Sequence, residues 1–276
     1  MNCAWNELLA ILPPRIRPEV DRHGRDSAEE LRLRVNAPPE LRCGRNSLWL
    51  KDRITGEDIR CCVNTASRFS PWASAGTASG YVTAPGGHRI GLCGEAVMIE
   101  GRVTGVRNIQ GLCIRIARDF PGIAQPLAGL KGSVLILGAP GWGKTTLLRD
   151  LIRRRSDREV HVGVVDQRGE LFPGDFPRGT CTDVLTGCPK AAGIDMLLRT
   201  MGPETIALDE ITAREDCEAL IQAAWCGVDL IATVHASCLE DLQRRELYRS
   251  LMREGIFDHL VILNRDKSWH VERSRA

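Results

Sequence analysis

A glycine-rich segment that ends in a lysine and a threonine is the strongest chemical signal in this sequence. Residues 138–145 read GAPGWGKT and match the P-loop pattern G-x-x-x-x-G-K-[ST]. Glycines let several backbone N–H groups point at one anion, and the helix after such a loop presents its positive end to it. Lys144 would reach the β- and γ-phosphates, and the Thr145 hydroxyl would coordinate Mg²⁺. The candidate nucleotide-binding residues are Gly138, Ala139, Pro140, Gly141, Trp142, Gly143, Lys144, Thr145 and Thr146.

A chance match in a glycine-rich turn is the alternative for this segment. The continuous apolar run 134–137 directly before it is typical of a strand that is buried on both faces. A helical pattern follows at about 143–155. This strand–loop–helix context favours the phosphate-binding interpretation over the chance match.

An acidic pair, Asp209 and Glu210, comes directly after a second apolar run at 205–208. The carboxyl edge of a parallel sheet is where a P-loop fold places its nucleotide. We therefore expect Asp209 to hold Mg²⁺ with Thr145, and Glu210 to polarise the attacking water. The alternative is a loop cap at a strand end.

Three more polar residues follow strands of the same kind. His235 ends the run 229–234 and either contacts the γ-phosphate or is a hydrogen-bonded loop histidine. Asp166 and Glu170 follow the run 160–165, where they either order the water and the metal or form a capped turn. The candidate catalytic residues are thus Glu210, Lys144, His235, Asp166 and Glu170, and the candidate metal ligands are Thr145 and Asp209.

Strands that alternate with helices must position these residues. Buried strands are predicted at 134–137, 160–165, 205–208, 229–234 and 259–263, and helices at 143–155, 192–201, 214–226 and 238–253. This order implies βαβ units and a parallel sheet with helices on both sides. A loop of about 25 residues is expected before the second helix. The arginine run 153–155 reads as a solvated helix end.

A smaller α+β domain is expected before this one. The patterns predict helices at 3–12 and 56–68, a polar loop at 15–27, a strand at 31–35 and a hairpin turn at 85–88. Thr55 is the predicted cap of the second helix. Turn signals at 119–127 place the boundary, so the expected domains are 1–122 and 123–276.

Composition excludes several classes of protein. Of the 276 residues, 26% are charged and 43% hydrophobic, which excludes a disordered or collagen-like chain. Eleven cysteines without a C-x-x-C pair disfavour a disulfide framework or a zinc ribbon, so a cytoplasmic location is expected. No apolar run is long enough to span a membrane. Residues 1–131 hold 18 Lys and Arg against 13 Asp and Glu, a mild excess that with few aromatics argues against nucleic acid.

The four motifs in this order resemble those of the secretion and pilus-retraction ATPases, which are RecA-like hexameric motors. The sequence is similar over nearly its whole length to the stage III sporulation protein AA family of endospore-forming bacteria. The segments that carry this resemblance are 138–150, 165–168, 183–190, 203–211 and 231–235, with 30–34, 80–83, 86–92 and 114–118 in the first half.

The resemblance implies a RecA-like P-loop ATPase core that hydrolyses ATP with Mg²⁺, assembles into a ring and has its nucleotide at subunit interfaces. It also implies membrane proteins of a sporulation channel as partners, and a peripheral position on the cytoplasmic face of that membrane complex. Arg89, Arg115 or Arg118 would reach the triphosphate, as similar arginines do in the related motors. The alternative for each arginine is a salt-bridged surface strand.

Two departures from the family pattern leave a second function open. Gln167 stands where the family has Glu, and residues 212–213 replace a Gly-Arg pair. A nucleotide-gated structural subunit with little turnover is therefore the alternative to an ATP-hydrolysing motor. A nucleic-acid translocase and a small-molecule P-loop kinase are further alternatives that the sequence disfavours.

Overall fold

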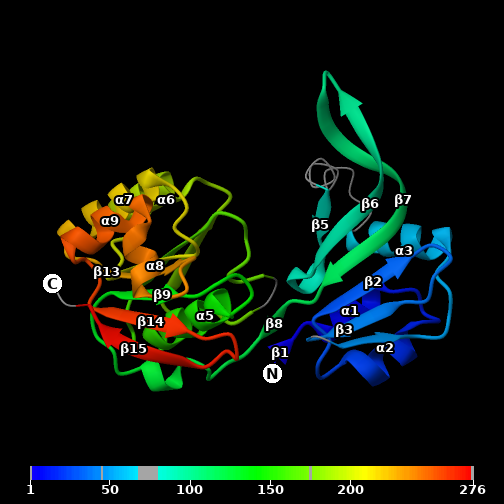
Figure 1. Cartoon of the computed structure of the whole chain (residues 1–276), viewed down its shortest axis with the longest axis horizontal. Coiled ribbons are helices and arrows are strands. Elements are labelled where there is room, and N and C mark those ends of the chain that lie inside the picture. The colour runs from blue at the N-terminus through cyan, green and yellow to red at the C-terminus, as the bar shows by residue number, and fades with distance from the viewer. Residues whose placement is uncertain (1, 45, 68–79, 174–175, 275–276) are drawn as a thin grey trace. The chain divides into compact units, whose positions relative to one another are not determined.

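The computed structural model describes residues 2–44, 46–67, 80–173 and 176–274. The chain divides into two compact units (Figure 1). The first unit comprises Met1–Asp119 with Pro173–Phe176, and the second comprises Phe120–Phe172 with Pro177–Ala276. The division after Asp119 lies close to the expected boundary after residue 122.

The first unit is built on an antiparallel sheet in the order β4-β3-β2-β7-β6-β5. Its strands are β2 (Glu30–Arg34), β3 (Glu40–Cys43), β4 (Asn46–Trp49), β5 (Tyr81–Thr83), β6 (Arg89–Ile99) and β7 (Arg102–Arg115). Its helices are α1 (Trp5–Ile11), α2 (Arg17–Gly24) and α3 (Gly56–Ala66), and the short strands β1 (Asn2–Cys3) and β8 (Arg118–Asp119) pair with each other.

The core of the first unit lies between one face of this sheet and its helices. Alternation in β2 places Leu31 and Leu33 in the core, where they join buried side chains of all three helices. Helix α3 starts as expected, because the Thr55 hydroxyl accepts from the Asp58 N–H and the Asp58 carboxylate accepts from the Thr55 N–H. The prediction of a loop at 15–27 is wrong, since α2 occupies its middle and buries Val20.

The second unit is built on a sheet in the order β11-β10-β12-β13-β9-β14-β15. All neighbouring strands are parallel except the last pair, β14 and β15. The strands are β9 (Val134–Leu137), β10 (Val162–Asp166), β11 (Thr182–Thr186), β12 (Thr205–Leu208), β13 (Asp229–Val234), β14 (His259–Leu263) and β15 (Trp269–Arg273). This is the expected α/β fold with a parallel sheet.

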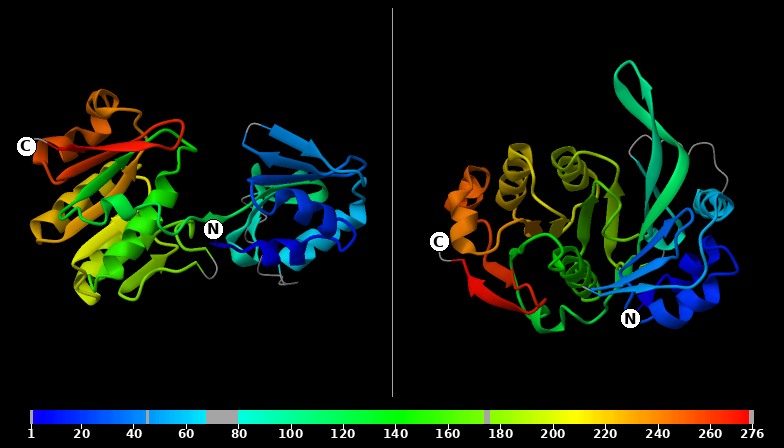
Figure 2. Two further views of the ribbon diagram at one scale, coloured as in Figure 1. Left: turned by 90° about the horizontal axis from the view of Figure 1, so that it is seen from below. Right: turned by 45° about the vertical axis from the view of Figure 1, so that its right-hand side comes forward.

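Helices cover both faces of this sheet (Figure 2). Helix α5 packs on one face, and α6, α7 and α9 pack on the other. The helices are α5 (Lys144–Ser156), α6 (Lys190–Thr200), α7 (Arg214–Trp225), α8 (Leu239–Arg244) and α9 (Glu246–Glu254). Among the described residues, no helix is long and apolar enough to cross a membrane.

Three local expectations for the second unit are corrected. The long loop contains the edge strand β11, and the helix expected at 238–253 breaks at Arg245 into α8 and α9. The arginines at the end of α5 are not a solvated run, because Arg153 and Arg155 are buried. Arg153 pairs with Asp150, which is 1% exposed, and Arg155 pairs with Asp229. These ion pairs tie the end of α5 to its surroundings.

Candidate functional site

The P-loop connects β9 to α5, and its glycines have structural reasons to be glycine. Gly141 and Gly143 have φ angles of 78° and 100°, in the left-handed region that other residues rarely adopt. A Cβ atom on Gly138 would lie 3.2 Å from Lys144 Cγ and 3.3 Å from Leu263 Cβ. The loop therefore wraps tightly over the carboxyl end of β9, and α5 begins at Lys144 directly after it. This places the positive end of α5 at the loop, as a phosphate site requires.

Lys144 is fixed at the mouth of this loop. Its Nζ donates to the carbonyl oxygens of Gly138 and Ala139 at 2.8 and 3.2 Å, and to His235 Nδ1 at 3.1 Å. Burial lowers the pKa of Lys144, while the charges of Asp209 and Glu210 oppose that shift. The Lys144 ammonium is thus a buried cation near two carboxylates. A group of higher negative charge, such as a phosphate, would stabilise this cation further.

Asp209 is held between two hydroxyl groups. Thr145 Oγ1 donates to Asp209 Oδ2 at 2.7 Å, and Thr233 Oγ1 donates to Asp209 Oδ1 at 2.7 Å. Thr233 is fully buried, and its hydroxyl also accepts from the Glu210 N–H at 2.8 Å. One side chain on β13 therefore positions both members of the acidic pair.

A hard cation fits this arrangement of oxygen atoms. Mg²⁺ prefers carboxylate and hydroxyl oxygens and usually keeps several waters. The Thr145 hydroxyl and the Asp209 carboxylate converge at the start of α5, with their oxygens 2.7 Å apart. Both predicted metal ligands therefore lie where one ion can contact them.

Glu210 sits in a strained backbone conformation beside His235. Its φ of 54° is left-handed, which is uncommon for a residue with a side chain and recurs at functional sites. Glu210 Oε1 lies 3.1 Å from His235 Nε2. Because His235 Nδ1 accepts from the Lys144 ammonium, the neutral ring carries its proton on Nε2 and donates it toward Glu210. Lys144, His235 and Glu210 thus form one hydrogen-bonded chain.

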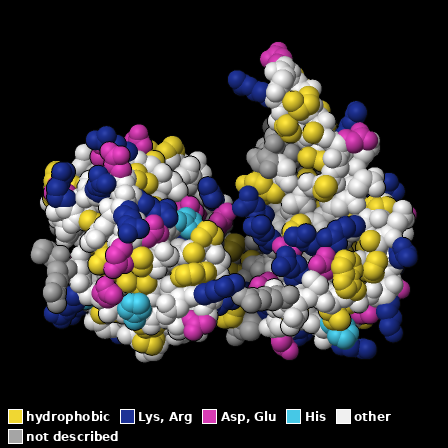
Figure 3. Space-filling model, in the orientation of Figure 1, with side chains coloured by type: hydrophobic (Ala, Val, Ile, Leu, Met, Phe, Trp, Pro, Cys, Tyr) yellow, Lys and Arg dark blue, Asp and Glu magenta, His cyan; other side chains and the backbone are white. Residues whose placement is uncertain are grey.

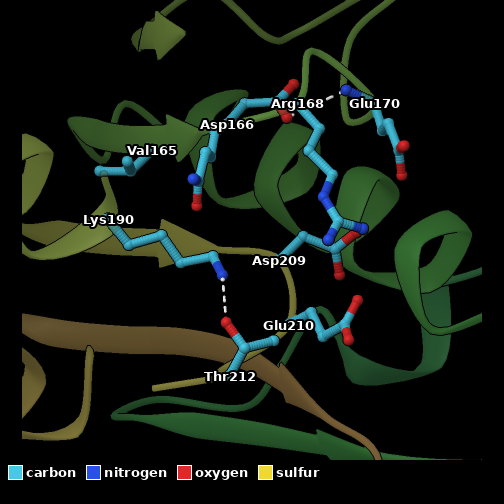
Figure 4. Close-up of a pocket in the computed structure, with 9 residues that line it drawn as sticks. Val165, Asp166, Arg168, Glu170, Lys190, Asp209, Glu210 and Thr212 are labelled. Atoms are coloured by element: carbon cyan, nitrogen blue, oxygen red, sulfur yellow. Dashed lines mark hydrogen bonds between the residues drawn. The ribbon is translucent and has the colours of Figure 1, made fainter. Parts of the chain in front are cut away.

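The turn after β10 lines a cavity next to this chain (Figure 4). Both carboxylate oxygens of Asp166 are used within the turn: Oδ1 accepts from the Glu170 N–H at 3.0 Å, and Oδ2 accepts from the Leu171 N–H at 2.9 Å. This is the capped-turn geometry. The lining residues are Val165, Asp166, Gln167, Arg168, Glu170, Lys190, Asp209, Glu210 and Thr212.

Two of these lining residues are cations that the motifs did not single out. The Arg168 side chain reaches across the cavity toward Asp209 (Figure 4). Lys190, the first residue of α6, donates to Thr212 Oγ1 at 3.1 Å and lies 3.6 Å from Asp216 Oδ2. It therefore braces the loop that follows Glu210.

The structure brings five of the predicted side chains together in two linked groups. Lys144, His235 and Glu210 form one hydrogen-bonded chain, and Thr145 contacts Asp209. The Thr233 hydroxyl joins the two groups, because it contacts both the Asp209 carboxylate and the Glu210 N–H. Glu170 lines the adjoining cavity. In the P-loop, Trp142 packs on the core beneath α5, whereas Pro140 and Gly141 are exposed.

Sequence reasoning missed Thr233, which holds Asp209 and Glu210 together. The signal was available, because Thr233 is a hydroxyl at the end of an apolar strand, two residues before His235. Such a residue on a strand that neighbours both β9 and β12 is placed to reach the P-loop and the acidic pair.

The three arginines that were predicted to reach the triphosphate lie in the first unit, where two of them make contacts within that unit. Arg118 donates to the carbonyl oxygens of Gly24, Arg25, Asp26 and Ala28, so it caps the end of α2 and braces its own unit. Arg89 stacks on Tyr81 with its guanidinium carbon 3.9 Å from the ring centre. For all three arginines, Arg89, Arg115 and Arg118, contact with a triphosphate stays a prediction.

Sequence comparisons identify relatives over nearly the whole chain. A family model described as "Sporulation stage III, protein AA" matches residues 4–272. The stage III sporulation protein AA of Bacillus subtilis (strain 168) is 37% identical over 281 residues, which cover 95% of this chain and 92% of that protein. An uncharacterised ycf45 protein of Porphyra purpurea is 30% identical, over 86% of this chain and 41% of that protein.

Two solved structures share the fold. The pilus retraction motor PilT with bound ADP has a TM-score of 0.62 at 18% identity, covering 90% of this chain and 76% of that chain. The Legionella pneumophila ATPase DotB has a TM-score of 0.59 at 19% identity, covering 89% of this chain and 76% of that chain. These likenesses show the RecA-like P-loop architecture of this chain.

Proposed function

The chain belongs to the sporulation stage III, protein AA family, and from that premise we propose that it binds ATP with Mg²⁺ and hydrolyses it. One observation carries the proposal. The P-loop lysine and threonine are joined by contacts to both acids and to His235, all at the carboxyl edge of the sheet. A structural turn has no need for two carboxylates and a buried ammonium at one point.

Each side chain has a defined part in the proposed reaction. The P-loop N–H groups and Lys144 bind the phosphates and stabilise charge on the oxygens of the γ-phosphate. Thr145 and Asp209 would hold Mg²⁺, which neutralises negative charge on the β- and γ-phosphates when bound. Glu210 accepts a hydrogen bond from the attacking water and orients it.

His235 links the ends of this site. Its ring accepts from Lys144 and donates toward Glu210, so movement of Lys144 toward a γ-phosphate would leave Nδ1 without its donor. The histidine would then turn and release Glu210. We propose that His235 couples the presence of the γ-phosphate to the position of the acid.

Assembly and location form the second part of the proposal. The family membership supports a ring of this chain that docks on membrane proteins of a sporulation channel, at the cytoplasmic face of the membrane. The shared fold with secretion and pilus ATPases supports a motor role for that ring. Binding without turnover would instead make the chain a nucleotide-gated structural subunit.

Phosphate release with Mg²⁺-ATP tests the proposal over a range of protein concentrations. Lys144→Ala should abolish nucleotide binding, and Glu210→Gln should bind ATP without turnover. Lys131→Ala and Glu215→Gln make the same changes at exposed positions and should leave both properties intact. Turnover that survives in Glu210→Gln refutes the role of Glu210, and a wild-type chain that binds ATP without turnover supports the structural subunit.

A further inference from the structure

The face of the first unit's sheet that points away from its core is lined by arginines. The register places Arg32 and Arg34 of β2 on one face with Arg42 of β3, Arg115 of β7 and Arg89 of β6. The side chains between them, such as Leu31 and Ile114, point into the core on the other face. Five arginines from four neighbouring strands therefore share one surface, over which dark blue side chains gather in Figure 3.

Two glutamates on this face leave an excess of positive charge. Glu30 and Glu40 lie between the arginines, and Arg34 contacts Glu40 at 2.9 Å while Arg42 lies 3.6 Å from Glu30. Burial opposes ionisation of the two carboxyls, but hydrogen bonds from Arg32 and Arg34 keep the pKa of each below its usual range. Both glutamates are thus charged at neutral pH, and the face carries a net charge of about +3.

Aromatic side chains stand at both edges of the same face. The register of β4 and β5 places Trp49 and Tyr81 on the arginine side. Arg34 lies over the Trp49 ring at 5.9 Å, and Arg89 lies over the Tyr81 ring at 3.9 Å. Trp49 is nevertheless 53% exposed, so one face of a large ring is open to solvent.

We propose that this arginine face binds single-stranded nucleic acid. Planar guanidinium groups pair with phosphates and stack on bases, and the positive side chains on this face are all arginines. Exposed aromatics on an open sheet are the platforms on which single-stranded bases stack. A duplex instead requires an element that enters a groove.

The size of the face sets the length of strand that it can hold. Trp49 and Tyr81 are on strands separated by five steps in the sheet, which is about 24 Å at roughly 4.8 Å per step. The rise of about 3.4 Å per nucleotide in a duplex would give roughly seven nucleotides over this distance, and because an unstacked single strand is more extended, about seven is the upper limit. The proposal differs from the sequence expectation because the basic residues are scattered along the chain and only the sheet register collects them on one side.

Binding should depend on salt in proportion to the charge of the face. Neutralising about three phosphates gives a slope near −2 for log affinity against log salt, at about −0.7 per phosphate for a single strand. A fourfold rise in salt, from 50 to 200 mM, should then weaken binding by roughly 20-fold. Fluorescence anisotropy of a labelled twelve-residue oligo(dT) with the full chain measures this directly.

Matched variants in the two units distinguish binding by this face from an effect of the net charge of the protein. Trp49→Ala should weaken binding of the oligonucleotide about fivefold or more, and Arg42→Gln should weaken it and lower the salt slope. Trp225→Ala and Arg214→Gln make the same changes at exposed positions of α7 and should have no effect. Circular dichroism checks that the first two variants are folded.

Four results of the binding assay without nucleotide would overturn the proposal. These are no binding at 50 mM salt, equal losses in the control variants, equal affinity for a duplex, and equal affinity for polyaspartate without dependence on Trp49. Loss of oligonucleotide binding in millimolar Mg²⁺-ATP would also overturn it, because the arginines would then serve the triphosphate. The outcome is independent of hydrolysis, so failure of the ATPase proposal leaves this test intact.

Discussion

Thr233→Val tests whether one buried hydroxyl organises the proposed catalytic acids. The substitution keeps the shape of the side chain and removes the donor to Asp209 Oδ1 and the acceptor for the Glu210 N–H. Asp209 keeps its hydrogen bond from Thr145, whereas Glu210 loses the contact that holds its left-handed backbone. The expected result is a misplaced Glu210 beside a P-loop that is still able to bind nucleotide.

The size of the effect follows from one of the two lost hydrogen bonds, the one that Thr233 donates to the charged Asp209 carboxylate. A hydrogen bond to a charged group contributes about 1.5–3 kcal/mol, and each 1.4 kcal/mol of barrier corresponds to about a tenfold change in rate. Loss of the Asp209 bond in the transition state should therefore lower kcat roughly 10- to 150-fold. The KM for Mg²⁺-ATP should change little, because Thr233 lies behind the acids rather than in the P-loop.

Phosphate release and nucleotide-binding titrations measure these two quantities separately. Thr233→Ser restores the hydroxyl and should recover most of the rate. Thr205→Val is the matched control, since Thr205 is equally buried on the adjacent strand and its hydroxyl accepts from Arg155. It should cost stability without changing the kcat of the folded protein.

A Thr233→Val protein with the wild-type kcat would refute the reasoning. So would a loss of kcat that Thr233→Ser does not recover, or an equal loss in Thr205→Val. The first result would mean that Asp209 and Glu210 are placed by the P-loop side alone. The other two would mean that the effect comes from general damage to the sheet.

Three further predictions concern stability and pH. Asp150→Ala removes a carboxylate that accepts from Gly122, Ala124, Arg153 and Arg154, so thermal melting should show a loss of roughly 3–5 kcal/mol, or about 6–20 °C. Burial lowers the pKa of His88, whose Nδ1 accepts from the Ala117 N–H. Because the folded protein therefore favours the neutral ring, urea unfolding should show the full free energy of unfolding above about pH 6.5 and a loss as pH falls below it. Gly193→Ala would bring its Cβ within 2.6 Å of Val165 Cγ1, and should lower the melting temperature of the second unit by several degrees.

Each of these has a control and a contrary outcome. Asp195→Ala breaks an exposed pair with Arg199 and should cost only about 0.3–0.5 kcal/mol; an equal loss in Asp150→Ala would contradict the buried network. His88→Gln should flatten the pH dependence, so an unchanged profile would assign it to other groups. Gly129→Ala is the comparison for Gly193→Ala, because nothing lies within 4 Å of a Cβ at Gly129. An equal fall of the melting temperature in both variants would contradict the predicted clash with Val165.

The fold of the second unit was accessible from the sequence because its strands are continuous apolar runs. The predicted runs at 134–137, 205–208, 229–234 and 259–263 are strands in the structure. The edge strands were not accessible in this way. β11 has the half-exposed sequence TDVLT, and β15 pairs antiparallel at the border, so neither carries the apolar signal of a buried strand.

The arginines show where pattern reasoning fails in this chain. Residues 153–155 have the composition of a solvated helix end, but Arg153 and Arg155 are buried. Asp150 pairs with both Arg153 and Arg154, and Asp229 pairs with Arg155. Asp166 is a second residue whose surroundings the sequence pattern did not reveal. Its position after a strand is typical of a catalytic acid, and only the backbone geometry shows that its two oxygens accept the N–H groups of Glu170 and Leu171. A part for Asp166 in the reaction stays a prediction.

The sequence by itself determined the P-loop, the acidic pair and the parallel-sheet architecture. These depend on local spacing, on glycine conformations and on apolar runs that are contiguous in the chain. Only the tertiary structure decided which partners these residues have. Thr145, Asp209 and Thr233 meet because β9, β12 and β13 are neighbours in the sheet, although they are far apart in sequence. Strand order and register set such contacts, and long-range packing rather than local propensity selects both.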